Sequence, residues 1–80
     1  MRREADQHFQ FALCLDNAGY LASLEIGKLY LVIPDDEAAA HGYFRVIDES
    51  GEDYAYATSR FHLVQLPVTT EKALLAALGQ

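Results

Sequence analysis

The sequence predicts a mainly all-β domain: a small five-stranded Src-homology-3-like barrel with a short C-terminal helix. Five short runs rich in β-branched and aromatic residues are separated by the turn formers Gly, Pro, Asn and Asp. Short strands joined by short loops, with one late helix, favour a barrel or sandwich over a parallel sheet. A single tight turn at residues 59–61, just before the last strand, is typical of a Src-homology-3-like barrel.

The first expected strand covers residues 9–15 and is half buried. Its apolar residues alternate with smaller or more polar ones: Phe9, Phe11, Leu13 and Leu15 against Gln10, Ala12 and Cys14. A period of two indicates a strand with one apolar face. The turn formers of residues 16–20 end this strand, and residues 21–26 are either an irregular loop or an extended arm.

Four further strands are expected at residues 28–34, 43–48, 54–58 and 62–66. Pro34 and Pro67 close the second and the fifth strand, because proline removes a donor from the strand ladder. Between the second and third strands, an alanine-rich segment forms one turn of helix. Asp35 caps the start of this turn and Gly42 stops it.

The C-terminal helix is expected over residues 70–78, with Thr69 or Thr70 opening it. Its large apolar residues form a stripe at helical spacing: Leu74, Leu75 and Leu78. A stripe of this kind can dock on another chain, but it more often packs against one end of its own barrel.

The acidic turn between the third and fourth strands is expected to have a three-residue loop, residues 49–51. A two-residue loop would oppose like charges and would force Ser50 to a positive φ, which serine resists. The longer loop instead places Gly51 at the left-handed position of a bulge. It also sets two cross-strand pairs: Val46 with Tyr54 and Phe44 with Tyr56.

The composition indicates one folded domain spanning residues 1–80, with its core at about residues 8–67. The net charge of −6 works against binding to nucleic acids and to anionic membranes, both of which attract Lys and Arg. The single cysteine, Cys14, allows no internal disulfide, and no apolar run is long enough to span a membrane. We therefore expect a cytoplasmic protein.

The acids of the DESGED turn allow three interpretations. A calcium loop needs oxygen ligands at a spacing that this turn does not have. A catalytic carboxylate pair needs a cleft that desolvates one of its two acids. We favour a solvent-exposed, charged turn whose acids meet Arg45, Arg60 or Lys28 on neighbouring strands.

No cofactor, metal site or catalytic residue is expected, because Cys14 and the three histidines lack zinc spacing and any flanking catalytic motif. The five tyrosines are more simply residues at the rim of the core, but they could also line a shallow groove. The candidate partner-binding surface consists of five residues: Tyr20, Arg45, Asp48, Tyr54 and Tyr56.

Two motifs resemble a family of short bacterial proteins of unknown function: N-x-x-Y-x-x-S-L-E-x-G-K-x-Y-x-x-x-P-D at residues 17–35 and R-V-I-D-E-S-G-E-D-Y-x-Y at residues 45–56. The likeness covers about residues 9–67. It implies a bacterial origin and a compact barrel-like domain, but no activity. It also implies that Arg45, Asp48 and Asp53 form an ion-pair lattice.

We expect a small non-enzymatic module that binds a protein or peptide partner, because the sequence holds no catalytic constellation. A nucleic-acid-associated barrel is an alternative, although the charge opposes it. A small enzyme or metal-binding protein is a third interpretation. A homodimer formed through an open sheet edge or the leucine stripe is compatible with all three.

Overall fold

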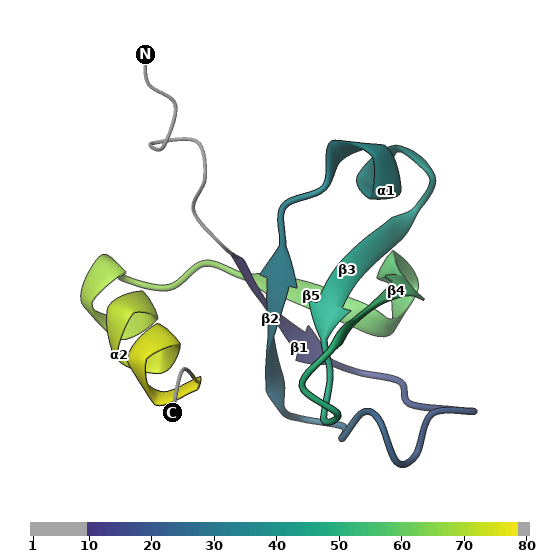
Figure 1. The fold of residues 1–80 in the computed structure, drawn as a ribbon, viewed down its shortest axis with the longest axis horizontal. Helices are drawn as coiled ribbons and strands as arrows, with labels where there is room; N and C mark the ends of the chain where they lie inside the picture. The colour runs from purple at the N-terminus through teal and green to yellow at the C-terminus, as the bar shows by residue number, and fades with distance from the viewer. Residues whose placement is uncertain (1–9, 79–80) are drawn as a thin grey trace.

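The computed structural model describes residues 10–78, which form an antiparallel sheet with two α-helices and a 3₁₀ turn (Figure 1). In chain order the elements are β1 (Gln10–Cys14), β2 (Leu29–Ile33), α1 (Asp36–Ala40), β3 (Tyr43–Ile47), β4 (Asp53–Ala57), the 3₁₀ turn η2 (Thr58–Arg60), β5 (Phe61–Val64) and α2 (Val68–Leu78). The prediction of a mostly β chain with a short C-terminal helix is confirmed. Phe9, at which we expected the first strand to begin, lies outside the described residues.

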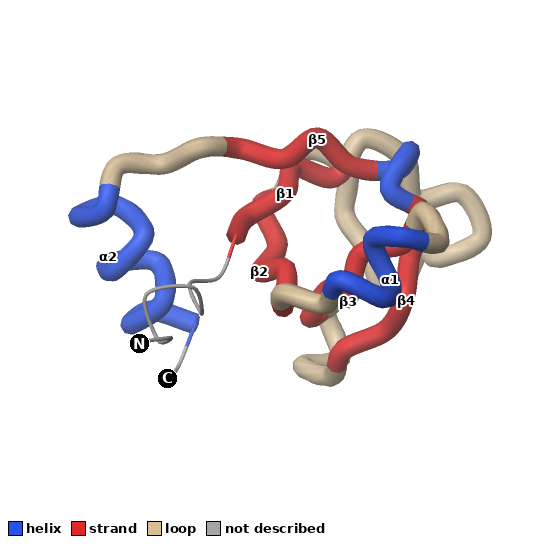
Figure 2. The backbone as a smooth tube through the Cα atoms, turned by 90° about the horizontal axis from the view of Figure 1, so that it is seen from above, coloured by secondary structure: helices blue, strands red, loops and turns tan. Residues whose placement is uncertain are grey.

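The strands pair in the order β4-β3-β2-β1-β5, and each pairing is antiparallel. Seen from above, they lie along a curved arc (Figure 2). Within residues 10–78 the two end strands, β4 and β5, do not pair with each other, so the sheet is not closed.

One face of the sheet, which we call the inner face, carries the core. The buried cluster consists of Ala12, Cys14, Leu24, Tyr30, Val32, Val46, Tyr56 and Phe61. On β1, Ala12 pairs with Tyr30 and Cys14 pairs with Phe61. A small side chain therefore stands beside a large ring in both pairs, which lets the rings close over the middle of the sheet.

The expected apolar face of β1 is wrong in part. Phe11 is buried as expected, but Leu15 is 52% exposed, whereas Ala12 and Cys14 are fully buried. The inner face of β1 thus carries its smallest residues. Because both faces of this strand are covered, alternation in hydropathy does not identify the face that meets the core.

The C-terminal helix α2 stands beside the opposite, outer face of the sheet (Figures 1 and 2). Leu75 on this helix shares the lining of a hollow with Leu29, Leu31 and Ile47. Leu74 is also half buried, while the side chain of Leu78 lies outside the described part of the chain. Leu75 of the leucine stripe thus faces the chain's own sheet across this hollow, beside a face of the sheet rather than at its end (Figure 2).

The short helix α1 begins and ends as its sequence predicts. Asp35 is its N-cap, and the carboxylate accepts a hydrogen bond of 3.0 Å from the backbone N–H of Ala38. Gly42 follows the helix at a φ of +84°, a conformation that glycine adopts without strain.

The β3–β4 hairpin has the predicted three-residue loop. The Asp48 N–H donates to the carbonyl of Glu52 at 3.1 Å, and Gly51 has a φ of +83°. The register is also confirmed: the pairs are Val46 with Tyr54 and Phe44 with Tyr56.

The connection between β1 and β2, residues 15–28, is an irregular loop that is anchored at its middle. Leu24 is 1% exposed within the core, and the Asn17 amide donates to its carbonyl at 3.0 Å. The backbone N–H of Glu49 donates to the carbonyl of Ser23 at 2.9 Å. The loop is therefore tied to the β3–β4 turn by a backbone hydrogen bond.

Gly51→Ala is expected to lower the free energy of unfolding by about 1 kcal/mol, because alanine is strained in the left-handed region. A Cβ at this position would meet no atom within 4 Å, so the loss comes from the backbone alone. Urea denaturation of the purified chain measures it. Gly51→Asn should lose less, since asparagine tolerates this conformation. An equal loss from both substitutions would contradict the backbone explanation.

Candidate functional site

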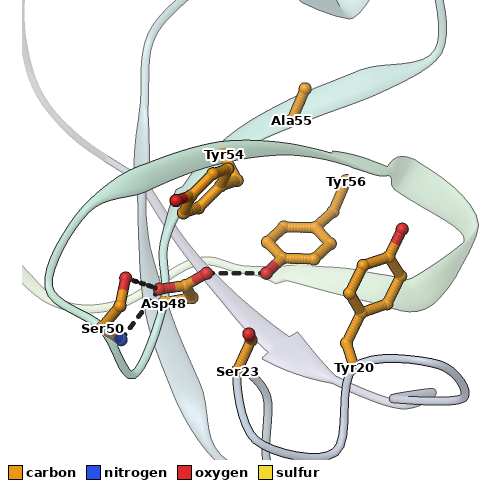
Figure 3. Close-up of a pocket in the computed structure, with 7 residues that line it drawn as sticks. All are labelled: Tyr20, Ser23, Asp48, Ser50, Tyr54, Ala55 and Tyr56. Atoms are coloured by element: carbon orange, nitrogen blue, oxygen red, sulfur yellow. Dashed lines mark hydrogen bonds between the residues drawn. The ribbon is translucent and has the colours of Figure 1, made fainter.

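A hollow of about 300 Å³ opens between the loop 15–28 and the β3–β4 hairpin (Figure 3). We call it the tyrosine pocket; it is lined by Tyr20, Ser23, Asp48, Ser50, Tyr54, Ala55 and Tyr56. Four residues of the candidate partner-binding surface therefore come together from distant parts of the sequence: Tyr20, Asp48, Tyr54 and Tyr56.

Asp48 forms part of the floor of this pocket and is only 5% exposed. One carboxylate oxygen, Oδ1, accepts from the Ser50 backbone N–H at 2.9 Å and from the Ser50 hydroxyl at 2.5 Å. The other, Oδ2, accepts from the Tyr56 hydroxyl at 2.7 Å. Figure 3 shows these bonds converging on the carboxylate. The expectation that the acids of this turn are all solvent-exposed is therefore wrong for Asp48.

Hydrogen bonds keep the Asp48 carboxylate in its charged form. Burial alone raises the pKa of Asp48, but the bonds donated by Ser50 and Tyr56 outweigh burial and hold the pKa below its usual range. Burial and the Asp48 contact together raise the pKa of Tyr56 to about 12. At neutral pH the pair is thus a carboxylate and a neutral phenol that donates to it.

The three tyrosines of the pocket have different surroundings. Tyr56 is 4% exposed, and its ring meets the ring of Tyr20 edge to face at a centroid distance of 5.0 Å. The guanidinium carbon of Arg60 lies over the Tyr20 ring, 4.7 Å from its centroid. Tyr54 is 52% exposed, and no aromatic ring or cation of residues 10–78 packs on it. Tyr56 is thus a core residue, whereas Tyr20 and Tyr54 form the accessible walls.

Arg45, the remaining residue of the candidate surface, does not line the pocket. Its guanidinium bonds Asp53 Oδ2 through Nη2 at 2.8 Å and through Nε at 3.0 Å. Its Nη1 also reaches Asp35 Oδ2 at 3.4 Å. The expected ion-pair lattice thus contains Arg45 and Asp53, with Asp35 in the place of Asp48. Side chains along a strand alternate between the two faces of the sheet. Phe44 faces inward, so Arg45, the next residue, lies on the outer face.

Glu49 turns away from Asp48 toward β2. Its Oε2 accepts from Lys28 Nζ at 2.6 Å and from the Tyr30 hydroxyl at 2.5 Å. These contacts, led by Lys28, lower the pKa of Glu49. The predicted contact of the turn with Lys28 is therefore present, whereas Arg60 meets Asp16 at 3.5 Å.

Sequence reasoning missed Ser23, Ser50 and Ala55 as members of the site. Ser50 follows Asp48 by two residues, the spacing at which an aspartate accepts from a later backbone N–H, and this signal was available. Ser23 carries no local signal, since its place depends on the path of the long loop. Within the described chain, no cluster of three or more His, Cys, Asp or Glu residues could hold a metal ion. None of the helices of residues 10–78 is long and apolar enough to cross a bilayer.

Comparison of the chain with protein-family models, with curated proteins and with solved structures found no match. The geometry of the tyrosine pocket is therefore the main basis for a functional proposal.

Asp48→Asn is expected to destabilise the fold by about 2 kcal/mol at pH 7, because hydrogen bonds to a charged acceptor are lost. The folded-state pKa of Asp48 lies below its unfolded value of about 3.9. The stabilisation is therefore complete above that value and disappears as the pH falls through the folded-state pKa. Urea denaturation of both chains between pH 7 and about pH 2.5 measures the difference.

Glu52→Gln is the matched control, because Glu52 is an exposed acid of the same turn. Its stability should follow that of the unchanged chain within about 0.5 kcal/mol at neutral pH. If Asp48→Asn costs the same at both ends of the pH range, the charge of Asp48 is not what stabilises the turn.

Proposed function

We propose that this chain is a non-enzymatic binding module that takes an extended segment of a protein partner at the tyrosine pocket. The main support is the pair of accessible tyrosine walls, Tyr20 and Tyr54, which are 42% and 52% exposed beside a hollow. Tyrosine suits recognition surfaces because it offers apolar area and a hydroxyl group at little entropic cost.

The free edge of β4 supports an extended partner. Within residues 10–78, β4 pairs only with β3, so its other side is open to a further strand. Along an antiparallel pair, positions that are hydrogen-bonded to the partner strand alternate with positions that are not. Asp48 and Glu52 form a hydrogen-bonded position. Counted from there, Ala55 is at a position that directs its backbone N–H and C=O away from β3. Since Ala55 also lines the pocket, backbone pairing and side-chain recognition are adjacent.

We infer that the sheet is a Src-homology-3-like barrel. The pairing of β1 with both β2 and β5 supports this, as does the 3₁₀ turn η2 directly before β5. The two sequence motifs support a bacterial origin, and the lone Cys14 supports a reducing cytoplasm.

Selection from a displayed library of random dodecapeptides tests the binding function. The enriched peptides should bind the purified chain and lose at least about fivefold in affinity to Tyr54→Ala, the loss expected of a recognition residue. Tyr54 is half exposed, so its truncation should leave the fold intact.

Tyr43→Ala is the matched control. Tyr43 is 45% exposed and alternates with Phe44 along β3, so it lies on the outer face, away from the pocket. Its truncation should leave peptide affinity unchanged. A library that yields no peptide, or peptides that bind Tyr54→Ala equally well, would contradict the proposed function.

A further inference from the structure

The floor of the tyrosine pocket holds a negative charge, that of Asp48, which forms no ion pair with a cation of residues 10–78. Within residues 10–78, Ser50 and Tyr56 donate to the Asp48 carboxylate, and their donor groups are neutral. The ion pairs among residues 10–78 involve other acids: Asp16, Asp35, Glu49 and Asp53. A partly desolvated charge attracts a cation more strongly than one in water. Within the described residues, Asp48 Oδ2 accepts from the Tyr56 hydroxyl, and a carboxylate oxygen can accept a second hydrogen bond.

The wall beside this charge is an unoccupied aromatic face. The Tyr54 ring is half exposed and has no ring or cation packed on it within the described residues. Aromatic faces attract cations through the ring quadrupole, and arginine is the residue found there most often. A cation in the pocket would therefore meet both a ring and a carboxylate.

Elsewhere in this chain, another tyrosine and another aspartate already bind a guanidinium together. The guanidinium of Arg60 lies over the Tyr20 ring, 4.7 Å from its centroid, and reaches the Asp16 carboxylate at 3.5 Å. The pair formed by Tyr54 and Asp48 offers equivalent groups, and no cation of residues 10–78 occupies it. A guanidinium suits such a site better than an ammonium, because it is planar, weakly hydrated and able to stack.

We propose that the tyrosine pocket selects an arginine side chain of the partner segment, with the guanidinium over Tyr54 and directed at Asp48. This inference rests on the proposed function and names the residue that the pocket recognises. The extended backbone of the partner would lie along the free edge of β4, where Ala55 joins the edge to the pocket. The net charge of −6 favours the approach of a basic segment.

Titration of the ¹⁵N-labelled full chain, followed by amide chemical shifts, tests the inference with defined probes. N-acetyl-arginine N-methylamide should shift the amides of Ser50, Tyr54 and Ala55 in a saturable way. Neutral N-acetyl-norleucine N-methylamide, which has a similar aliphatic stem, should not. N-acetyl-lysine N-methylamide and tetramethylammonium should bind more weakly than the arginine probe. Equal binding of the norleucine probe overturns cation recognition, and equal or tighter binding of either other cation overturns the choice of guanidinium.

Two variants locate the site. Tyr54→Leu should weaken the arginine probe about fivefold, the loss expected for one cation–π contact. Asp48→Asn should weaken it further. Should Asp48→Asn fail to fold, Tyr54→Leu still decides, with Tyr43→Leu as the control that leaves binding unchanged. Unaltered affinity in Tyr54→Leu overturns the inference.

The peptide library separates this inference from the proposed function. Tyr54-dependent peptides without an arginine at a fixed position would overturn the arginine proposal and leave the binding module intact. A library without Tyr54-dependent peptides would overturn the binding module, while the arginine probe would still show whether the pocket takes a guanidinium.

Discussion

The Tyr56 hydroxyl donates a hydrogen bond of 2.7 Å to the Asp48 carboxylate. This bond joins the residue that follows β3 to the second half of β4. A carboxylate as buried as this one would be costly without such donors. Ser50 supplies the others from within the turn. The Asp48 carboxylate is therefore hydrogen-bonded only if the turn adopts the conformation that Gly51 permits. It also requires the Tyr56 ring to pack in the core, because only then does its hydroxyl reach Asp48. The turn and the core depend on each other through one side chain.

Glu49 extends this dependence to the other side of the molecule. Its backbone N–H holds the carbonyl of Ser23 in the long loop, and its carboxylate holds Lys28 and Tyr30 at the start of β2. The adjacent residues Asp48 and Glu49 thus hold the turn from two sides, Asp48 by its bond to β4 and Glu49 by its bonds to the long loop and β2. The backbone bond from Glu49 to Ser23 and the bonds to Asp48 hold residues that line the tyrosine pocket, so the shape of the pocket is set by the folded chain rather than by a ligand. A site that is ordered in advance loses less entropy on binding.

Local features of this fold were predictable from the sequence, and the long-range ones were not. The hairpin register followed from the φ that Ser50 resists and Gly51 accepts, and the cap of α1 followed from Asp35. The burial of Asp48 did not, because it depends on the inner-face position of Tyr56, eight residues further on. The core face of β1 was missed because Ala12 and Cys14 are small, and only their aromatic partners on β2 and β5 make them central. For the site, residue types identified Tyr20, Tyr54 and Tyr56, but only the path of the loop brings them together.

Cys14 lies fully buried on β1, between β2 and β5, and it is the single thiol of the chain. Burial raises the pKa of this thiol, which keeps it protonated and a poor nucleophile. In the folded state it is hidden from oxidants and from other thiols. A molecule whose β5 has separated from β1 would uncover it, and two such molecules could then be linked covalently. Disulfide-linked pairs of this protein would accordingly be a record of molecules that had opened, rather than a form in which the intact fold assembles.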